Sequence, residues 1–184
     1  MLLRDLIKEG TDLISSIYPE REAREMVYAC MESHLGTSRH THIIEPYYEV
    51  SEEEVCLIRS DFSRMASGEP MQYVLRKAYF YGRDFNVTPD VLIPRPETEE
   101  MAMMAVNAAE DGNSILDLCT GSGAIAIAVY KELEKQGKKV KMTAVDVSAD
   151  ALAVAKKNAV NNDADVLFIQ SDLFARIRGR FDII

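Results

Sequence analysis

The sequence predicts an α/β protein with three parts: a small helical bundle, a β-hairpin linker, and a parallel sheet with crossover helices. Residues 1–75 contain short amphipathic stretches that favour helices. Residues 76–93 alternate bulky and polar side chains around a glycine, which favours a hairpin. Residues 94–184 alternate strand and helix patterns, which is typical of a parallel sheet. We therefore expect domain boundaries near residues 75 and 93.

The first 75 residues carry three helical patterns. In the first, which ends at Pro19, the apolar residues with helical spacing are Leu3, Leu6, Ile7, Leu13, Ile14 and Ile17. The second stops near Gly36 and has the apolar residues Ala23, Met26, Val27, Cys30 and Met31. The third begins at Ser51, which forms a capping-box pattern with Glu54, and its expected buried stripe is Val55, Ile58, Phe62 and Met65. Because these helices are short, their apolar stripes should pack against one another.

The linker and the segment after it are predicted to be extended. Bulky and polar residues alternate over 79–87, on both sides of Gly82. Val91-Leu92-Ile93-Pro94-Arg95-Pro96 must also be extended, since each proline excludes its predecessor from helical space. A helix over 97–110 then begins with acidic residues.

The remainder repeats strand and helix in strict order. We expect strands at 115–118, 141–145 and 166–169, helices at 124–136 and 149–161, and the beginning of a fourth strand at 181–184. This alternation predicts a parallel sheet joined by crossover helices.

Composition excludes several classes of protein. The net charge of -9 argues against a protein that binds duplex DNA, so no direct binding of nucleic acid is expected. No apolar run approaches the roughly 18 residues of a membrane span. The chain becomes charged at Arg4, so no signal peptide and no membrane association are expected. These features predict a cytoplasmic protein.

The cysteines and histidines are the side chains of this chain that most often bind transition metals. Three widely spaced cysteines are interpreted as small core residues, as expected in a reducing compartment: Cys30, Cys56 and Cys119. Three histidines, His34, His40 and His42, lie close together in the sequence, but no cysteine or carboxylate pattern completes a site. The sequence therefore predicts no metal.

The sharpest local pattern is Asp117-Leu118-Cys119-Thr120-Gly121-Ser122-Gly123-Ala124, between a strand and a helix. Its two glycines allow a tight turn and a close approach of a ligand to the backbone. Asp146 ends the second strand, where a carboxylate can accept hydrogen bonds from both hydroxyls of a ribose. Asp172 and Leu173 follow the third strand and could meet an adenine. Together these residues predict a nucleoside-containing cofactor.

Two cofactors compete for this loop. The string from Gly121 to Ala126 fits the dinucleotide fingerprint, which is weak evidence alone. Asp117 favours S-adenosylmethionine, because a carboxylate attracts its sulfonium and ammonium groups but repels the pyrophosphate of a dinucleotide.

The chain resembles the HemK/PrmC family of protein-(glutamine-N5) methyltransferases. The resemblance rests on Gly68-Glu69-Pro70-Met71-Gln72-Tyr73, on the string from Val91 to Glu99, and on the string from Asp117 to Gly123. It implies a truncated Rossmann-like methyltransferase domain that methylates the glutamine in the Gly-Gly-Gln loop of class I peptide-chain release factors. The helical domain and the hairpin would help to bind the release factor.

The resemblance also implies a role for each residue at the cofactor site. The methionine part of S-adenosylmethionine would contact Cys119, Thr120, Gly121, Ser122 and Gly123. Asp146 would bind the ribose, and Asp172 with Leu173 would flank the adenine. Arg76, where the family has glycine, and Leu173, where it is often aromatic, depart from the pattern.

The family's Asn-Pro-Pro-Tyr motif, expected after Phe181, is absent. We therefore name no catalytic residue and expect this chain to be inactive alone. The alternatives are a truncated module that binds a release factor without catalysis and an N6-adenine DNA methyltransferase. Because the fourth strand would lack its usual neighbour, dimerisation through that strand, or poor order of its last residues, is also expected.

Overall fold

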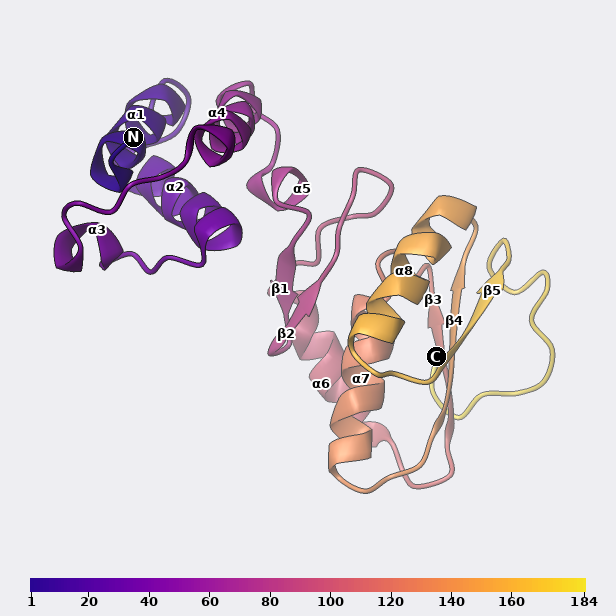
Figure 1. Ribbon diagram of the computed structural model, residues 1–184. Helices are drawn as coiled ribbons and strands as arrows, with labels where there is room; N and C mark the ends of the chain where they lie inside the picture. The colour runs from indigo at the N-terminus through magenta and orange to yellow at the C-terminus, as the bar shows by residue number, and fades with distance from the viewer. The chain divides into compact units, whose positions relative to one another are not determined.

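The computed structural model describes all residues from 1 to 184 and divides into two compact units, Met1–Leu75 and Arg76–Ile184 (Figure 1). The hairpin belongs to the second unit, together with the parallel sheet. The further boundary at residue 93 stays a prediction. None of the helices has both the length and the apolar character that crossing a bilayer requires.

The first unit is a helical bundle. Its three longer helices are α1 (Leu3–Ile14), α2 (Glu20–Leu35) and α4 (Glu52–Ala66), and each contacts the other two. The short helices α3 (Thr41–Ile44) and α5 (Met71–Val74) lie in the connections. The capping box is present: the Ser51 hydroxyl accepts from the Glu54 amide, and the Glu54 carboxylate accepts from the Ser51 amide at 3.1 Å. These helices share one core, whose completely buried members include Leu6, Ile14, Val27, Cys30, Ile58, Phe62 and Met65.

The predicted apolar stripe of the first helix is wrong at two positions. Leu13 and Ile17 are 43% and 51% exposed. Leu13 lies at the edge of the stripe, and Ile17 lies beyond the end of α1. The stripe instead includes Gly10, where a Cβ atom would come within 2.5 Å of the Phe62 ring. Gly10 thus permits the close packing of α1 on α4.

The second unit begins with the predicted hairpin. Strands β1 (Ala78–Phe80) and β2 (Arg83–Phe85) are antiparallel, with Ala78 opposite Phe85. An extended segment leads to α6 (Thr98–Ala108), in agreement with the two prolines before it.

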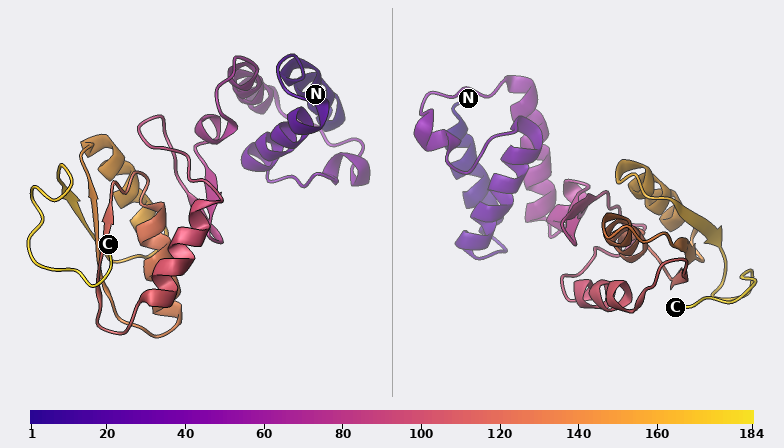
Figure 2. Two further views of the ribbon diagram at one scale, coloured as in Figure 1. Left: turned by 180° about the vertical axis from the view of Figure 1, so that it is seen from behind. Right: turned by 90° about the horizontal axis from the view of Figure 1, so that it is seen from below.

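The remaining elements form a parallel sheet with crossover helices. The strands are β3 (Ser114–Leu118), β4 (Lys141–Asp146) and β5 (Val166–Gln170), in the spatial order β3-β4-β5. Helix α7 (Ala124–Lys135) joins β3 to β4, and α8 (Ala149–Asn161) joins β4 to β5. Helices α6, α7 and α8 lie on one face of this sheet (Figure 2). The α/β fold class is therefore confirmed.

The last residues lie along the free edge of β3. Ile183 forms a parallel bridge with Ile115, and its carbonyl accepts a hydrogen bond from Leu116 at 3.0 Å. The structure has only this isolated bridge over residues 181–184, where the sequence predicted the beginning of a fourth strand. The chain thus crosses from β5 to the opposite side of β3, so the order of the strands reverses at β3. The expected dimerisation through residues 181–184 stays a prediction.

Candidate cofactor-binding site

The segments that follow the three parallel strands lie at one edge of the sheet. They are the loop 119–123 after β3, the turn 147–148 after β4 and the turn 171–176 after β5. Ligands of open parallel sheets bind beyond the carboxyl ends of the strands, where the strand order reverses. The loop after β3 is at that point.

The loop 119–123 has an unusual backbone. Cys119, Gly121 and Gly123 have left-handed φ angles of 62°, 53° and 80°. The Thr120 amide donates to the carbonyl of Val145 at 2.9 Å, which joins the loop to β4. These three left-handed residues allow the tight turn of the backbone before α7.

The two glycines serve different purposes. A Cβ atom on Gly121 would meet no other atom within 4 Å, so the space above this residue is open. A Cβ atom on Gly123 would lie 3.0 Å from Ile127 and 3.2 Å from the Ala155 side chain. Gly121 therefore leaves room for a ligand, whereas Gly123 allows α7 and α8 to pack closely.

Two carboxylates are hydrogen-bonded to this loop. The Thr120 hydroxyl donates to Asp117 Oδ2 at 2.7 Å. Asp146 Oδ2 accepts from the Gly121 amide at 2.9 Å, and Asp146 Oδ1 accepts from the Ser148 amide at 3.0 Å. The structure thus brings Asp117, the loop and Asp146 together, although they lie up to 29 residues apart in sequence.

The electrostatics of Asp117 favour a cationic ligand. Burial raises the pKa of its carboxyl group, the neighbouring Asp146 charge raises it further, and the Thr120 hydrogen bond opposes both. A positive group in contact with Asp117 would stabilise its charged form. A pyrophosphate would instead add two further negative charges beside this pair of carboxylates.

Asp172 and Leu173 stand apart from this network. They lie on the turn after β5, which is joined to β4 by the hydrogen bond from the Ser171 amide to the Asp146 carbonyl at 3.0 Å. Both are exposed, Leu173 to 52%, and Leu173 has a φ of 44°. Their position beside the end of β4 is the one expected, and their contact with an adenine stays a prediction.

The sequence reasoning missed Asn158 of α8, which is completely buried. Its amide nitrogen donates to the carbonyls of Ser122 and Asn86, both at 2.9 Å. Its oxygen accepts from the Asn86 amide at 2.7 Å. Asn158 therefore joins the glycine loop to the segment that follows the hairpin. The sequence does contain a signal for this role, because Asn158 is a polar residue on a helix face that is otherwise apolar. The apolar residues of that face include Ala151, Leu152, Ala155 and Ala159.

Comparison with known proteins decides the family. A model of the PrmC N-terminal domain matches residues 5–75, and a model of the methyltransferase small domain matches residues 100–184. The release factor glutamine methyltransferase of Koribacter versatilis is 43% identical over 76% of this chain and 50% of its own length. That of Flavobacterium psychrophilum is 31% identical over 100% of this chain and 66% of its own length. The chain belongs to the HemK/PrmC family.

The chain spans about half to two thirds of the length of these curated HemK/PrmC relatives. Among solved structures, the ribosomal protein L11 methylase of Lactobacillus delbrueckii subsp. bulgaricus is 32% identical over 48% of this chain and 45% of its own, with a TM-score of 0.41.

The cofactor of this methyltransferase family is S-adenosylmethionine. Two features of the structure fit it. The partly buried Asp117 carboxyl group lies beside the loop, where the sulfonium and ammonium charges would balance it. The open space above Gly121 leaves the backbone accessible to the ligand.

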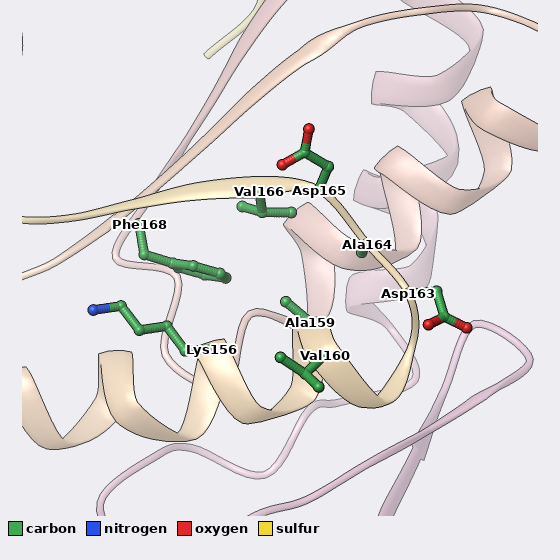
Figure 3. A pocket seen from close by; sticks show the side chains of 8 residues that line it. All are labelled: Lys156, Ala159, Val160, Asp163, Ala164, Asp165, Val166 and Phe168. Carbon is green, nitrogen blue, oxygen red and sulfur yellow. The ribbon is translucent and has the colours of Figure 1, made fainter.

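A cavity of about 520 Å³ lies elsewhere on this unit (Figure 3). It is formed by the end of α8 and the beginning of β5, and its lining residues are Lys156, Ala159, Val160, Asp163, Ala164, Asp165, Val166 and Phe168. This lining includes the amino end of β5, whereas the cofactor loop lies at the carboxyl ends of the strands. The cavity is therefore not the cofactor site of this HemK/PrmC chain.

The prediction that all three cysteines are core residues is wrong for two of them. Cys30 is buried, whereas Cys56 and Cys119 are exposed. Cys56 lies on α4 outside its apolar stripe, and Cys119 lies in the loop after β3. Burial raises the pKa of Cys30 to about 12.

This difference among the thiols predicts a labelling pattern. A thiol reagent should modify Cys56 and Cys119 rapidly and Cys30 slowly, because the thiolate is the reactive form. Saturating S-adenosylhomocysteine should slow the labelling of Cys119 at least about fivefold and leave Cys56 unchanged, as peptide mass spectrometry would measure. Equal protection of both cysteines, or of neither, would contradict a cofactor position over the loop.

Proposed function

We propose that residues 119–123 hold the methionine part of S-adenosylmethionine and that Asp117 balances its positive charge. Asp146 binds the ribose hydroxyls, and Asp172 with Leu173 flanks the adenine. The observation that carries this assignment is the network in which Asp117 and Asp146 both bind the glycine loop, at 2.7 Å and 2.9 Å. Asp146 can still accept from a ribose, since each carboxylate oxygen has more than one lone pair.

We further propose that the enzyme containing this chain methylates the N5 nitrogen of the glutamine in the Gly-Gly-Gln loop of class I release factors. The activity of the relatives, which are release factor glutamine methyltransferases by name, and the match of both family models support this proposal. The helical unit and the hairpin would bind the release factor. The enzyme would act in translation termination.

The chemistry requires precise orientation of the substrate amide. An amide nitrogen is a poor nucleophile, because its lone pair is delocalised into the carbonyl. Holding it in line with the sulfonium methyl group lowers the barrier without a strong general base. The family's Asn-Pro-Pro-Tyr motif would supply this orientation. The 184 residues do not contain that string, so we assign cofactor binding to them and name no catalytic residue.

The activity is tested with labelled cofactor and a purified release factor. The 184-residue chain is compared with a version extended by a family segment that carries Asn-Pro-Pro-Tyr. We expect label on the glutamine of the Gly-Gly-Gln loop with the extended protein and none with the 184-residue chain alone. Label on adenine in DNA would instead support the N6-adenine alternative. Release-factor binding without any transfer by the extended protein would support the non-catalytic module.

A further inference from the structure

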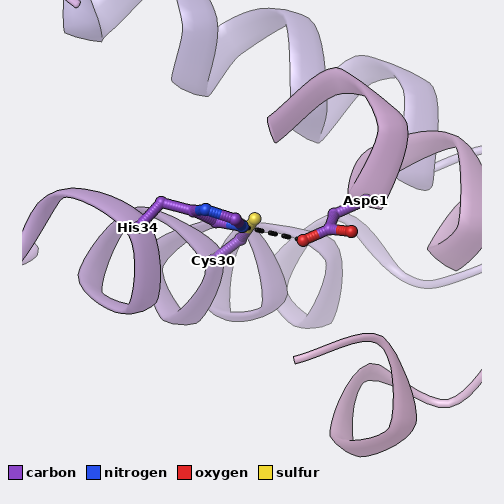
Figure 4. Close-up of side chains that lie close together, drawn as sticks. All are labelled: Cys30, His34 and Asp61. Atoms are coloured by element: carbon purple, nitrogen blue, oxygen red, sulfur yellow. Dashed lines mark hydrogen bonds and ion pairs between the residues drawn. The ribbon is translucent and has the colours of Figure 1, made fainter. Parts of the chain in front are cut away.

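Three potential metal ligands from two helices converge in the helical unit. They are Cys30 and His34 on α2 and Asp61 on α4 (Figure 4). Their ligand atoms all lie within 4.8 Å of one another. His34 Nε2 and Asp61 Oδ2 are 2.8 Å apart and form a hydrogen bond between the two helices.

The sequence interpretation grouped His34 with His40 and His42, and the structure gives it different neighbours. Cys30 and His34 are four residues apart on α2, so they project from the same face of that helix. Asp61 faces them from α4. His42 instead stacks on Tyr28, with ring centroids 5.9 Å apart. Cys30 and Asp61 therefore lie beside His34 in the structure. The spacing of the three histidines in the sequence did not predict this group.

The ligand set suits zinc. Sulfur, imidazole nitrogen and carboxylate oxygen are the donors that Zn²⁺ uses, and three protein ligands leave a fourth position for water. In a tetrahedral site neighbouring donors are about 3.3–3.8 Å apart, so these side chains would need to shift by roughly 1 Å. One thiolate and one carboxylate would balance the charge of the ion, and the thiol proton would pass to solvent.

Burial and access are also compatible with an ion. Cys30 is completely buried, whereas the side chains of His34 and Asp61 are 26% and 14% exposed. The ion could therefore enter from the side of the histidine and the carboxylate. Water could reach the fourth position from the same side.

The Arg64 guanidinium beside Asp61 is already paired with another carboxylate. Arg64 lies 3.5 Å from Asp61 Oδ1, but two of its guanidinium nitrogens bind the Glu69 carboxylate at 2.8 Å and 2.5 Å. Asp61 Oδ2 faces His34 rather than Arg64. One carboxylate oxygen is thus directed toward the other two ligands.

We propose that Cys30, His34 and Asp61 bind one Zn²⁺ ion, with water as the fourth ligand, and that the ion fastens α2 to α4. All three residues belong to the helical unit, whereas the cofactor loop belongs to the other unit, so zinc binding can be tested separately from cofactor binding.

The test uses the 184-residue chain after removal of metals, titrated with Zn²⁺ by calorimetry and with Co²⁺ by absorption spectroscopy. We expect one ion per chain, a thiolate-to-cobalt charge-transfer band, and a higher melting temperature with zinc. C30A, H34A and D61N should each weaken zinc binding at least about tenfold, and C30A should abolish the charge-transfer band. The matched controls C56S and H40A, at exposed positions, should change the affinity less than about twofold.

The proposal is overturned if the wild-type chain binds no stoichiometric zinc, or if C30A binds it as tightly as wild type. Binding that is lost in C56S and kept in H34A would also overturn it. Circular dichroism of each metal-free variant separates loss of a ligand from loss of the fold. H34A and D61N change partly exposed positions and should remain folded even if C30A does not.

Discussion

Replacing Asp146 by alanine should weaken the binding of S-adenosylhomocysteine at least tenfold. The substitution removes the acceptor for both ribose hydroxyls, and each charge-assisted hydrogen bond contributes about 1.5–3 kcal/mol. It also removes the acceptor of the Gly121 amide, so the loop loses one of its hydrogen bonds to the end of β4 and keeps the one from the Thr120 amide to the Val145 carbonyl. Isothermal titration calorimetry with the 184-residue chain measures the change in affinity.

Two further variants separate these effects. Asp146→Asn keeps one oxygen for the backbone amides but loses the charge, so it should weaken binding less than alanine does. Asp150→Ala removes an exposed carboxylate from the first turn of α8 and should change the affinity less than about twofold. An affinity unchanged in Asp146→Ala would show that the ribose is held elsewhere. Tight binding of NAD to the wild-type chain would favour the dinucleotide interpretation.

Local patterns were sufficient to predict most of the fold. Helix α2 ends at Gly36, whose left-handed φ of 65° is one that glycine adopts easily. Helix α4 begins after Ser51, which forms the predicted capping box with Glu54. The strand and helix alternation after Ser114 predicted the parallel sheet. The burial of Gly10 could not be predicted in this way, because it depends on Phe62, which is 52 residues away in the chain.

The site was predictable where a sequence motif encodes a backbone shape. The glycine loop and Asp146 could be placed at the same edge of the sheet, since the carboxyl ends of parallel strands coincide. The hydrogen bonds of Asn158 and the convergence of Asp61 on Cys30 could not, because they depend on the packing of distant elements. The exposure of Cys119 also depends on the loop conformation and is not visible in its apolar neighbours.

Loss of the Asn158 side chain should destabilise the second unit and loosen the cofactor loop. Asn158→Ala would leave three buried or partly buried backbone groups without a partner: the amide and carbonyl of Asn86 and the carbonyl of Ser122. An unsatisfied buried polar group costs about 1–3 kcal/mol, so the unit should lose on the order of 3 kcal/mol of stability. The loop 119–123 should also become more mobile, which would weaken cofactor binding.

Hydrogen exchange with mass spectrometry can distinguish this coupling from general destabilisation. In Asn158→Ala, amide exchange should accelerate in peptides that cover residues 119–123 and 86–91, as well as in α8. Peptides from α1, α2 and α4 belong to the other unit and should be unchanged, which provides an internal reference. Asn161→Ala, at an exposed position at the end of the same helix, should leave all of these rates near those of wild type. Faster exchange confined to α8, with the loop protected as before, would show that Asn158 anchors its helix without positioning the cofactor loop.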